Sequence, residues 1–165
     1  MRKRRTKMST PSGKFCFVII TPDAIRENIQ EKIIKDILQE AGCRVIWRKN
    51  VHIEERHVRE IYPQHVDRKH FPSIVRNFIS GPSLLFLLKS DSNCNLPEKI
   101  KEIKGLFDNN DGTLRASGLR AKHGAKIVKN ESGEIFEFRF HSSENELETK
   151  ALCNLFLKDG ERISC

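Results

Sequence analysis

The chain has 165 residues, of which 38% are hydrophobic, and carries a formal net charge of +8. This length is typical of one domain, and the apolar content excludes a wholly disordered protein. The longest apolar runs span only six residues, whereas a membrane helix needs about 20, so we expect no membrane partner. Five positive charges lie within the first seven residues, which leaves +3 for the rest of the chain.

The sequence divides into one central domain and two tails. Residues 1–13 combine the basic cluster with a Ser-Thr-Pro-Ser-Gly linker and are predicted to be a disordered tail. Residues 14–158 hold the domain, and residues 159–165 form a C-terminal tail. Basic tails of this kind also occur in nuclear-localisation signals and nucleic-acid-binding arms, so nucleic acid is a less favoured partner.

The five cysteines form no CxxC pair, and no Cys and His occur at zinc spacing. We therefore predict no protein-held metal site. Unpaired cysteines within apolar segments are typical of a reducing compartment, so we expect the protein in the cytoplasm or the nucleus.

Apolar periodicity predicts the secondary structure in chain order. Isoleucines repeat every four residues between Pro22 and Gly42, which predicts one helix that Gly42 ends. The other predicted strands are 15–20, 43–49 and 83–88, with a hairpin at 125–129 and 134–140. The other predicted helices are 54–61, 71–79, 96–106, a short one within 112–120, and 144–157. This order predicts an α+β fold, a ferredoxin-like split βαβ antiparallel sheet covered on one face by helices.

One local segment indicates chemistry. Phe138–Glu144 reads FRFHSSE, in which His141 ends a strand and two serines open a helix. A histidine there can act as a nucleophile or a general base, beside helix-terminal N–H groups that favour an anionic substrate. Taken alone, the segment favours the simpler reading, a structural histidine followed by a capping serine.

Five segments, in the same order, resemble motifs of the nucleoside diphosphate kinase family over about residues 15–157. They are Val18–Ala24 (VIITPDA), Ile61–His65 (IYPQH), Phe71–Pro82 (FPSIVRNFISGP), Gly112–Arg115 (GTLR) and His141–Asn145 (HSSEN). The first is similar to the family's KPDA motif, the fourth to GTIR and the last to HGSDS. Each motif is short, but five in order are specific, and they identify 14–158 as a domain similar to these kinases.

The resemblance implies a divergent nucleoside diphosphate kinase, which moves the γ-phosphate of a nucleoside triphosphate to a nucleoside diphosphate through phosphohistidine at His141. Mg²⁺ would be carried by the nucleotide phosphates. The implied nucleotide-binding residues are Tyr62, His70, Phe71, Lys101, Arg115 and Ser143. Of these, His70 or Phe71 would stack on the base, and Arg115 would hold a phosphate. Family members form hexamers or smaller oligomers, so the resemblance also implies a homo-oligomer.

The chain departs from the family pattern at several polar positions. Thr21 replaces the lysine of KPDA, Lys101 an arginine, Phe107 a threonine and Phe138 a sugar-binding asparagine. No carboxylate aligns where the last helix of the family orients the histidine, because Ala151 or Leu152 stands there.

These losses are large enough to matter. One charged hydrogen-bond partner contributes about 1.5–3 kcal/mol, so losing several lowers the rate on the order of a thousandfold. An insertion that holds the predicted hairpin also separates Arg115 from His141. The alternative is therefore a catalytically degenerate binding or assembly module of the same fold.

Overall fold

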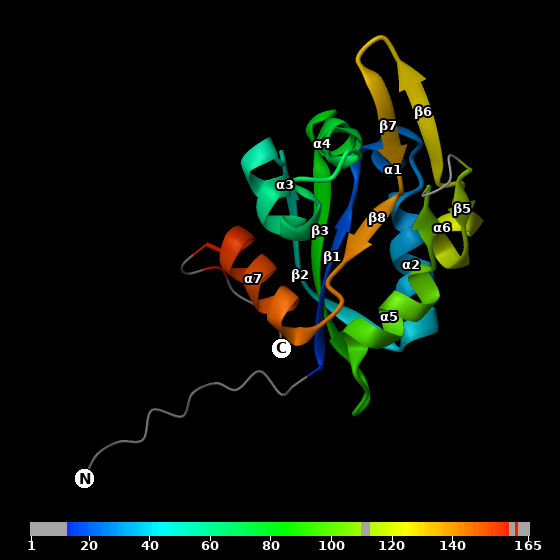
Figure 1. Cartoon of the computed structure of the whole chain (residues 1–165). Helices are drawn as coiled ribbons and strands as arrows, with labels where there is room; N and C mark the ends of the chain where they lie inside the picture. Colours follow the sequence, from blue (N-terminus) through cyan, green and yellow to red (C-terminus); the bar gives the residue numbers. More distant parts are fainter. Residues whose placement is uncertain (1–12, 110–112, 159–160, 162–165) are drawn as a thin grey trace.

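The computed structural model describes residues 13–109, 113–158 and 161, so the expected tails lie almost entirely outside the described residues. Its centre is a four-stranded antiparallel sheet in the order β2-β3-β1-β8 (Figure 1). The strands are β1 (Phe15–Ile20), β2 (Cys43–Val51), β3 (Ser83–Ser90) and β8 (Phe140–Ser142). This order, with helices between the strands, confirms the predicted ferredoxin-like α+β fold. Within the described ranges, no helix is both long and apolar enough to cross a membrane.

Helices cover both faces of the sheet, so the expected covering of one face is wrong. One face packs against α3 (Glu55–Ile61), α4 (Phe71–Ile79) and α7 (Glu146–Phe156). The other packs against α1 (Pro22–Arg26), α2 (Gln30–Ala41), α5 (Leu96–Lys104) and α6 (Gly118–Lys122). The reason lies in β1, where Phe17 and Ile19 face one layer and Val18 and Ile20 the other, all four fully buried. A strand that is apolar on both faces needs cover on both.

The predicted helix over 22–41 is two helices. α1 ends at Arg26 and α2 begins at Gln30, and Asn28 between them has φ of 57°. Asparagine tolerates this left-handed conformation better than most residues, so the chain turns there while the isoleucine periodicity continues. Gly42 ends α2 in the left-handed conformation, as the sequence predicts.

The segment after α5 also differs from the prediction. A two-stranded ladder joins β4 (Phe107–Asp108) to β5 (Arg115–Ala116), and the helix expected within 112–120 begins only at Gly118. Gly105 and Gly118 both have positive φ, and a Cβ on Gly105 would lie 2.2 Å from the Ser117 carbonyl oxygen. The two glycines therefore permit a close backbone approach that prevents an earlier helix start.

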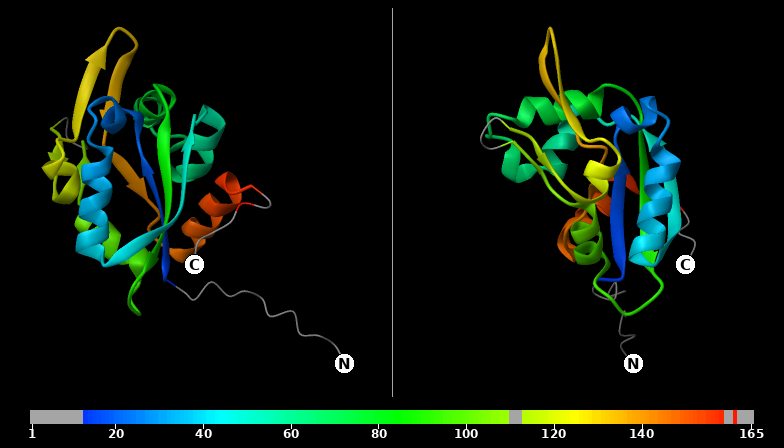
Figure 2. Two further views of the ribbon diagram at one scale, coloured as in Figure 1. Left: turned by 180° about the vertical axis from the view of Figure 1, so that it is seen from behind. Right: turned by 90° about the vertical axis from the view of Figure 1, so that its right-hand side faces the viewer.

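The predicted hairpin is confirmed as β6 (Lys126–Asn130) and β7 (Gly133–Glu137), and it extends beyond the rest of the domain (Figure 2). Two side chains of α4 hold its second strand. Arg76 Nη1 donates to the Glu134 carbonyl at 2.8 Å, and Asn77 Nδ2 donates to the Phe136 carbonyl at 2.7 Å. The second strand of the hairpin, from beside the turn to its middle, is therefore fixed to the layer that includes α4. A short 3₁₀ helix, Pro63–His65, lies between α3 and α4.

A buried ion pair fixes the start of β8. Arg139 has φ of 74°, and its backbone N–H donates to Asp23 Oδ2 at 3.1 Å, while its Nη1 lies 3.3 Å from the same oxygen. Its other guanidinium nitrogens donate to the carbonyls of His123 and Gly124. The side chains of Asp23 and Arg139 are 0% and 3% exposed. The pair therefore joins α1, the end of α6 and β8.

We expect Asp23→Asn to lower the free energy of unfolding by about 1.5–3 kcal/mol, because it weakens a buried charged hydrogen bond of Arg139. Glu27 also pairs with Arg139 Nη1 and remains as its second carboxylate partner. The control is Asp91→Asn in the exposed Arg44–Asp91 pair, where the loss should stay below about 1 kcal/mol. Urea unfolding followed by circular dichroism measures both. Equal losses in the two variants would show that the buried pair does not anchor β8.

Candidate active site

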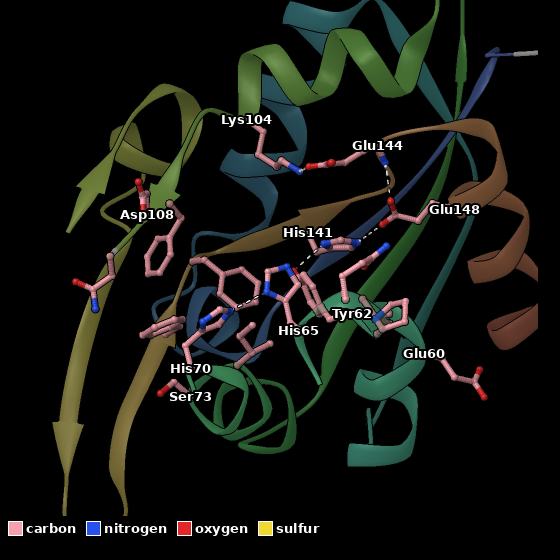
Figure 3. A pocket seen from close by; sticks show the side chains of 18 of the residues that line it. Glu60, Tyr62, His65, His70, Ser73, Lys104, Asp108, His141, Glu144 and Glu148 are labelled. Carbon is pink, nitrogen blue, oxygen red and sulfur yellow. Dashed lines mark hydrogen bonds and ion pairs between the residues drawn. The ribbon is translucent and has the colours of Figure 1, made fainter. Parts of the chain in front are cut away.

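A cavity of about 1170 Å³ lies beside β8, between the layer of α3, α4 and α7 and the ends of α5 and α6 (Figure 3). Its volume is sufficient for a nucleotide-sized ligand. The titratable side chains that line it are Glu60, His65, Lys69, His70, Lys104, Asp108, Arg120, Glu134, His141, Glu144 and Glu148, together with Tyr62. Imidazole, cationic and carboxylate groups thus meet in one cavity.

The strand register turns His141 into this cavity. His141 pairs with Ile19 of β1, whose side chain belongs to the core on the α3, α4 and α7 face. Since side chains alternate along a strand, Phe140 and Ser142 point to the opposite face. His141 is 5% exposed, so its imidazole is buried at the wall of the cavity.

Two hydrogen bonds hold the imidazole of His141. The Tyr62 hydroxyl lies 2.7 Å from Nδ1, and Glu148 Oε1 lies 2.9 Å from Nε2 (Figure 3). An ionised carboxylate can only accept a hydrogen bond, so Nε2 carries the proton and Nδ1 presents its lone pair to the tyrosine hydroxyl. The expectation that no carboxylate of the last helix orients the histidine is therefore wrong. Glu148 lies about one turn before Ala151 and Leu152 on α7.

The pKa values of these groups agree with a neutral imidazole. Burial lowers the pKa of His141, and the Glu148 hydrogen bond opposes this shift only in part. Burial alone would raise the pKa of Glu148, but the hydrogen bond and charge of His141, the Glu144 backbone N–H and Lys104 together outweigh it, so the net pKa is lowered. Burial raises the pKa of Tyr62, so its hydroxyl stays protonated and able to donate.

Two cations approach the same end of the cavity from the opposite layer. Lys104 ends α5, its side chain is 4% exposed, and burial and the nearby Arg120 lower its pKa to about 8. Arg120 of α6 donates from Nη2 to the Phe140 carbonyl at 3.0 Å, while its Nε is buried with no hydrogen-bond partner. Both cations contribute to lowering the pKa of His141. The cavity therefore has a positively charged end beside the histidine.

The family model described as nucleoside diphosphate kinase matches residues 15–161 of this chain. The chain belongs to the nucleoside diphosphate kinase family. It is 30% identical over 130 residues to the nucleoside diphosphate kinase of Caulobacter sp. (strain K31), covering 74% of this chain and 91% of that relative. The nucleoside diphosphate kinase of Novosphingobium aromaticivorans is 32% identical over 127 residues, covering 74% and 90%.

Solved structures of the family share this fold. The Aquifex aeolicus nucleoside diphosphate kinase matches with a TM-score of 0.69 at 20% identity, covering 91% of this chain and 99% of that one. The Halobacterium salinarum nucleoside diphosphate kinase, solved in complex with CDP, matches with a TM-score of 0.71 at 20% identity, covering 93% of each chain.

In this member of the nucleoside diphosphate kinase family, two predicted cations lie away from the cavity. Lys101 is exposed on α5 and forms an ion pair with Glu144 at 3.5 Å, and Arg115 is exposed on β5; neither lines the cavity. Lys104 and Arg120 line it instead. The sequence held a signal for Lys104, which continues the four-residue spacing of the buried Leu96 and Ile100.

The other predicted residues divide between the cavity and the core. Tyr62 and His70 line the cavity, whereas Phe71 is 4% exposed in the hydrophobic core and Ser143 is fully buried. The Ser143 hydroxyl accepts from the Phe17 N–H at 2.9 Å and contacts Thr149 Oγ1 at 2.7 Å. Its contacts hold α7 against β1 and do not reach the cavity.

The far wall of the cavity is aromatic. The rings of Phe107 and Phe138 lie with their centroids 6.1 Å apart. The ring centroid of Phe136, on the hairpin, lies 5.4 Å from that of Phe107. Phe136 also stacks on His70, with ring centroids 6.0 Å apart and an interplanar angle of 17°. The cavity is therefore charged near His141 and apolar near the hairpin.

We expect His141 to titrate below its ordinary pKa of 6.5, and Glu148→Gln to lower this pKa further, because Glu148 favours the imidazolium form. Long-range ¹H–¹⁵N NMR of the imidazole as a function of pH measures both pKa and tautomer. Glu146→Gln is the control, since Glu146 lies on the same helix and pairs with Lys150. An unchanged or higher His141 pKa in Glu148→Gln would contradict the assignment.

Proposed function

We propose that the protein transfers the γ-phosphate of a nucleoside triphosphate to a nucleoside diphosphate through a phosphohistidine at His141. The observation that carries this proposal is the pair of hydrogen bonds on the imidazole. Glu148 fixes the proton on Nε2 at 2.9 Å, so the lone pair of Nδ1 is the nucleophile. The lowered pKa of His141 keeps Nδ1 unprotonated at neutral pH.

The chemical step uses both nitrogens of the imidazole ring. Nδ1 attacks the γ-phosphorus, an N–P bond forms, and the bond from phosphorus to the β,γ-bridging oxygen breaks, releasing the nucleoside diphosphate. Positive charge then develops on the imidazole, and the carboxylate of Glu148 stabilises it. Tyr62 leaves Nδ1 to make room for phosphorus, and its hydroxyl remains close enough to donate to a phosphoryl oxygen. The second half-reaction reverses these steps with another nucleoside diphosphate.

Lys104 and Arg120 would bind the phosphates at the charged end of the cavity. Cations in a buried site interact strongly with phosphoryl oxygens, and arginine can donate two parallel hydrogen bonds. Among the residues that the structure describes, no three His, Cys, Asp or Glu side chains group closely enough to hold a metal. Mg²⁺ would be carried by the nucleotide phosphates, whose charge it would neutralise, and would need few protein ligands.

A second candidate function follows from the aromatic wall. Phe107 and Phe138 place rings where the family has a threonine and a sugar-binding asparagine, so hydrogen bonds to a ribose are lost there. Thr21, at the family's lysine position, is fully buried and donates to Asp23 Oδ1, away from the cavity. These contacts favour weak nucleotide binding. If nucleotide binding is lost altogether, the protein is a non-catalytic binding or assembly module of this fold.

Three further properties complete the proposal. The family relationship supports assembly into a homo-oligomer, a hexamer or smaller. The described cysteines, Cys16, Cys43, Cys94 and Cys153, are all free thiols, which supports a reducing location in the cytoplasm or the nucleus. Binding of nucleic acid through the basic tail concerns residues 1–12, which lie outside the described residues.

Incubation with γ-³²P-labelled ATP and Mg²⁺ should give a phosphoprotein that is stable in alkali and labile in acid, as phosphohistidine is. His141→Ala should reduce the label to background, whereas His52→Gln, which changes an exposed histidine on the loop after β2, should label as the unmodified protein does. Equal labelling of the unmodified protein and His141→Ala would exclude the proposed transfer and favour the non-catalytic module.

The same labelling rate, measured at ATP concentrations below saturation, tests the phosphate-binding cations. We expect Lys104→Met to reduce it by about 10-fold to 100-fold, because one charged hydrogen bond contributes about 1.5–3 kcal/mol. Lys99→Met removes a lysine from the same helix and serves as the control. A larger loss of labelling rate in Lys101→Met than in Lys104→Met would support Lys101, the residue predicted from the sequence, as the phosphate-binding lysine. It would overturn the assignment to Lys104.

A further inference from the structure

Glu144 lies between two lysines at the charged end of the cavity. It follows β8 and precedes α7, and its Oε1 is 3.5 Å from Lys104 Nζ (Figure 3). Its Oε2 is 3.5 Å from Lys101 Nζ. Its backbone N–H donates to Glu148 Oε2 at 3.2 Å. The side chain is 44% exposed, so one residue at the mouth of the cavity contacts both a buried and an exposed lysine.

The two lysines differ strongly in environment. The Lys104 side chain is 4% exposed and that of Lys101 is 57% exposed. Among the described carboxylates, only that of Glu144 lies within 4 Å of Lys104 Nζ. A buried ammonium needs an anion more than an exposed one does, and Glu144 supplies part of that charge at a distance longer than an optimal charged hydrogen bond.

The hydrogen-bonding capacity of the two buried cations is incompletely satisfied even with Glu144 in place, although Glu148 also lines this end of the cavity. Arg120 lies close enough to Lys104 to lower its pKa, and its buried Nε has no hydrogen-bond partner. Of the two buried cations, the Glu144 carboxylate contacts only Lys104. A phosphoryl group carries more charge and three acceptor oxygens, so it satisfies both cations where Glu144 satisfies one.

We propose that Glu144 is an internal competitor for the phosphate site, which binds Lys104 when the site is empty and moves to Lys101 when an anion enters. This inference rests on the phosphate-binding role of Lys104 given under the proposed function. Lys101 is the acceptor of the displaced carboxylate because it already lies 3.5 Å from the second carboxylate oxygen. The exposed side chain of Glu144 can rotate into solvent without crossing the core.

Isothermal titration of the full chain with inorganic tripolyphosphate, without Mg²⁺, tests the competitor role apart from phosphoryl transfer. We expect Glu144→Gln to bind about tenfold more tightly than the unmodified protein, because one charged contact no longer has to be broken. Glu146→Gln removes the same charge one residue into α7, and its gain should be clearly smaller. Equal affinities in Glu144→Gln and Glu146→Gln, or no gain in either, would overturn the proposal.

Lys104→Met separates failure of this inference from failure of the phosphate site. If Lys104→Met loses binding while Glu144→Gln binds as the unmodified protein does, the phosphate site stands and the competitor role is wrong. If Lys104→Met, Glu144→Gln and the unmodified protein all fail to bind, both proposals fail. Tripolyphosphate binding that appears only in Glu144→Gln would support the proposal, because Glu144 then blocks the site in the unmodified protein.

A double-mutant comparison tests the acceptor role of Lys101. We expect Lys101→Met to weaken tripolyphosphate binding severalfold in the unmodified background and much less in the Glu144→Gln background, since no carboxylate then needs an acceptor. Circular dichroism confirms that each variant is folded. An equal loss in both backgrounds would show that Lys101 acts by its charge alone and would overturn the movement of Glu144.

Discussion

The buried ion pair between Asp23 and Arg139 helps to fix where β8 joins the sheet. β8 has only three residues, and hydrogen bonds from the Thr21 N–H to the Arg139 carbonyl and from the Ser143 N–H to the Phe17 carbonyl extend its pairing with β1. Arg139 adds bonds to α1 and to the end of α6. A slip of one residue would turn His141 to the opposite face of the sheet. The position of the imidazole between Tyr62 and Glu148 therefore depends on a charge pair outside the cavity.

Two functional groups lie about one helical turn from the positions that motif alignment predicts. Glu148 contacts the histidine from α7 in place of residues 151 or 152, and Lys104 lines the cavity in place of Lys101. Residues three or four apart lie on the same face of a helix. A carboxylate or a cation can therefore occur at a different sequence position and still reach the same cavity, so its absence from one aligned position does not remove that charge from the cavity.

The cavity combines a charged end with an aromatic wall. Near β8, the imidazole of His141 contacts Glu148, and Lys104 and Arg120 line the cavity beside it. Near the hairpin, Phe136 stacks on His70 and contacts Phe107, so this wall offers rings to a ligand. The proposed phosphate chemistry involves the first end, and the second end is where a base or sugar would meet aromatic rings.

The sequence by itself determined β1, β2 and β3, most of the helices, the hairpin and the histidine at the cavity wall, because these depend on local periodicity and on short motifs. It also identified Tyr62, which belongs to one of those motifs, and His70, which precedes another, and both line the cavity. Only the tertiary structure decided which charges surround His141. Glu148, Lys104 and Arg120 come from three helices that cover opposite faces of the sheet. Their approach to one imidazole depends on the packing of these layers around the edge at β8, which no local pattern encodes.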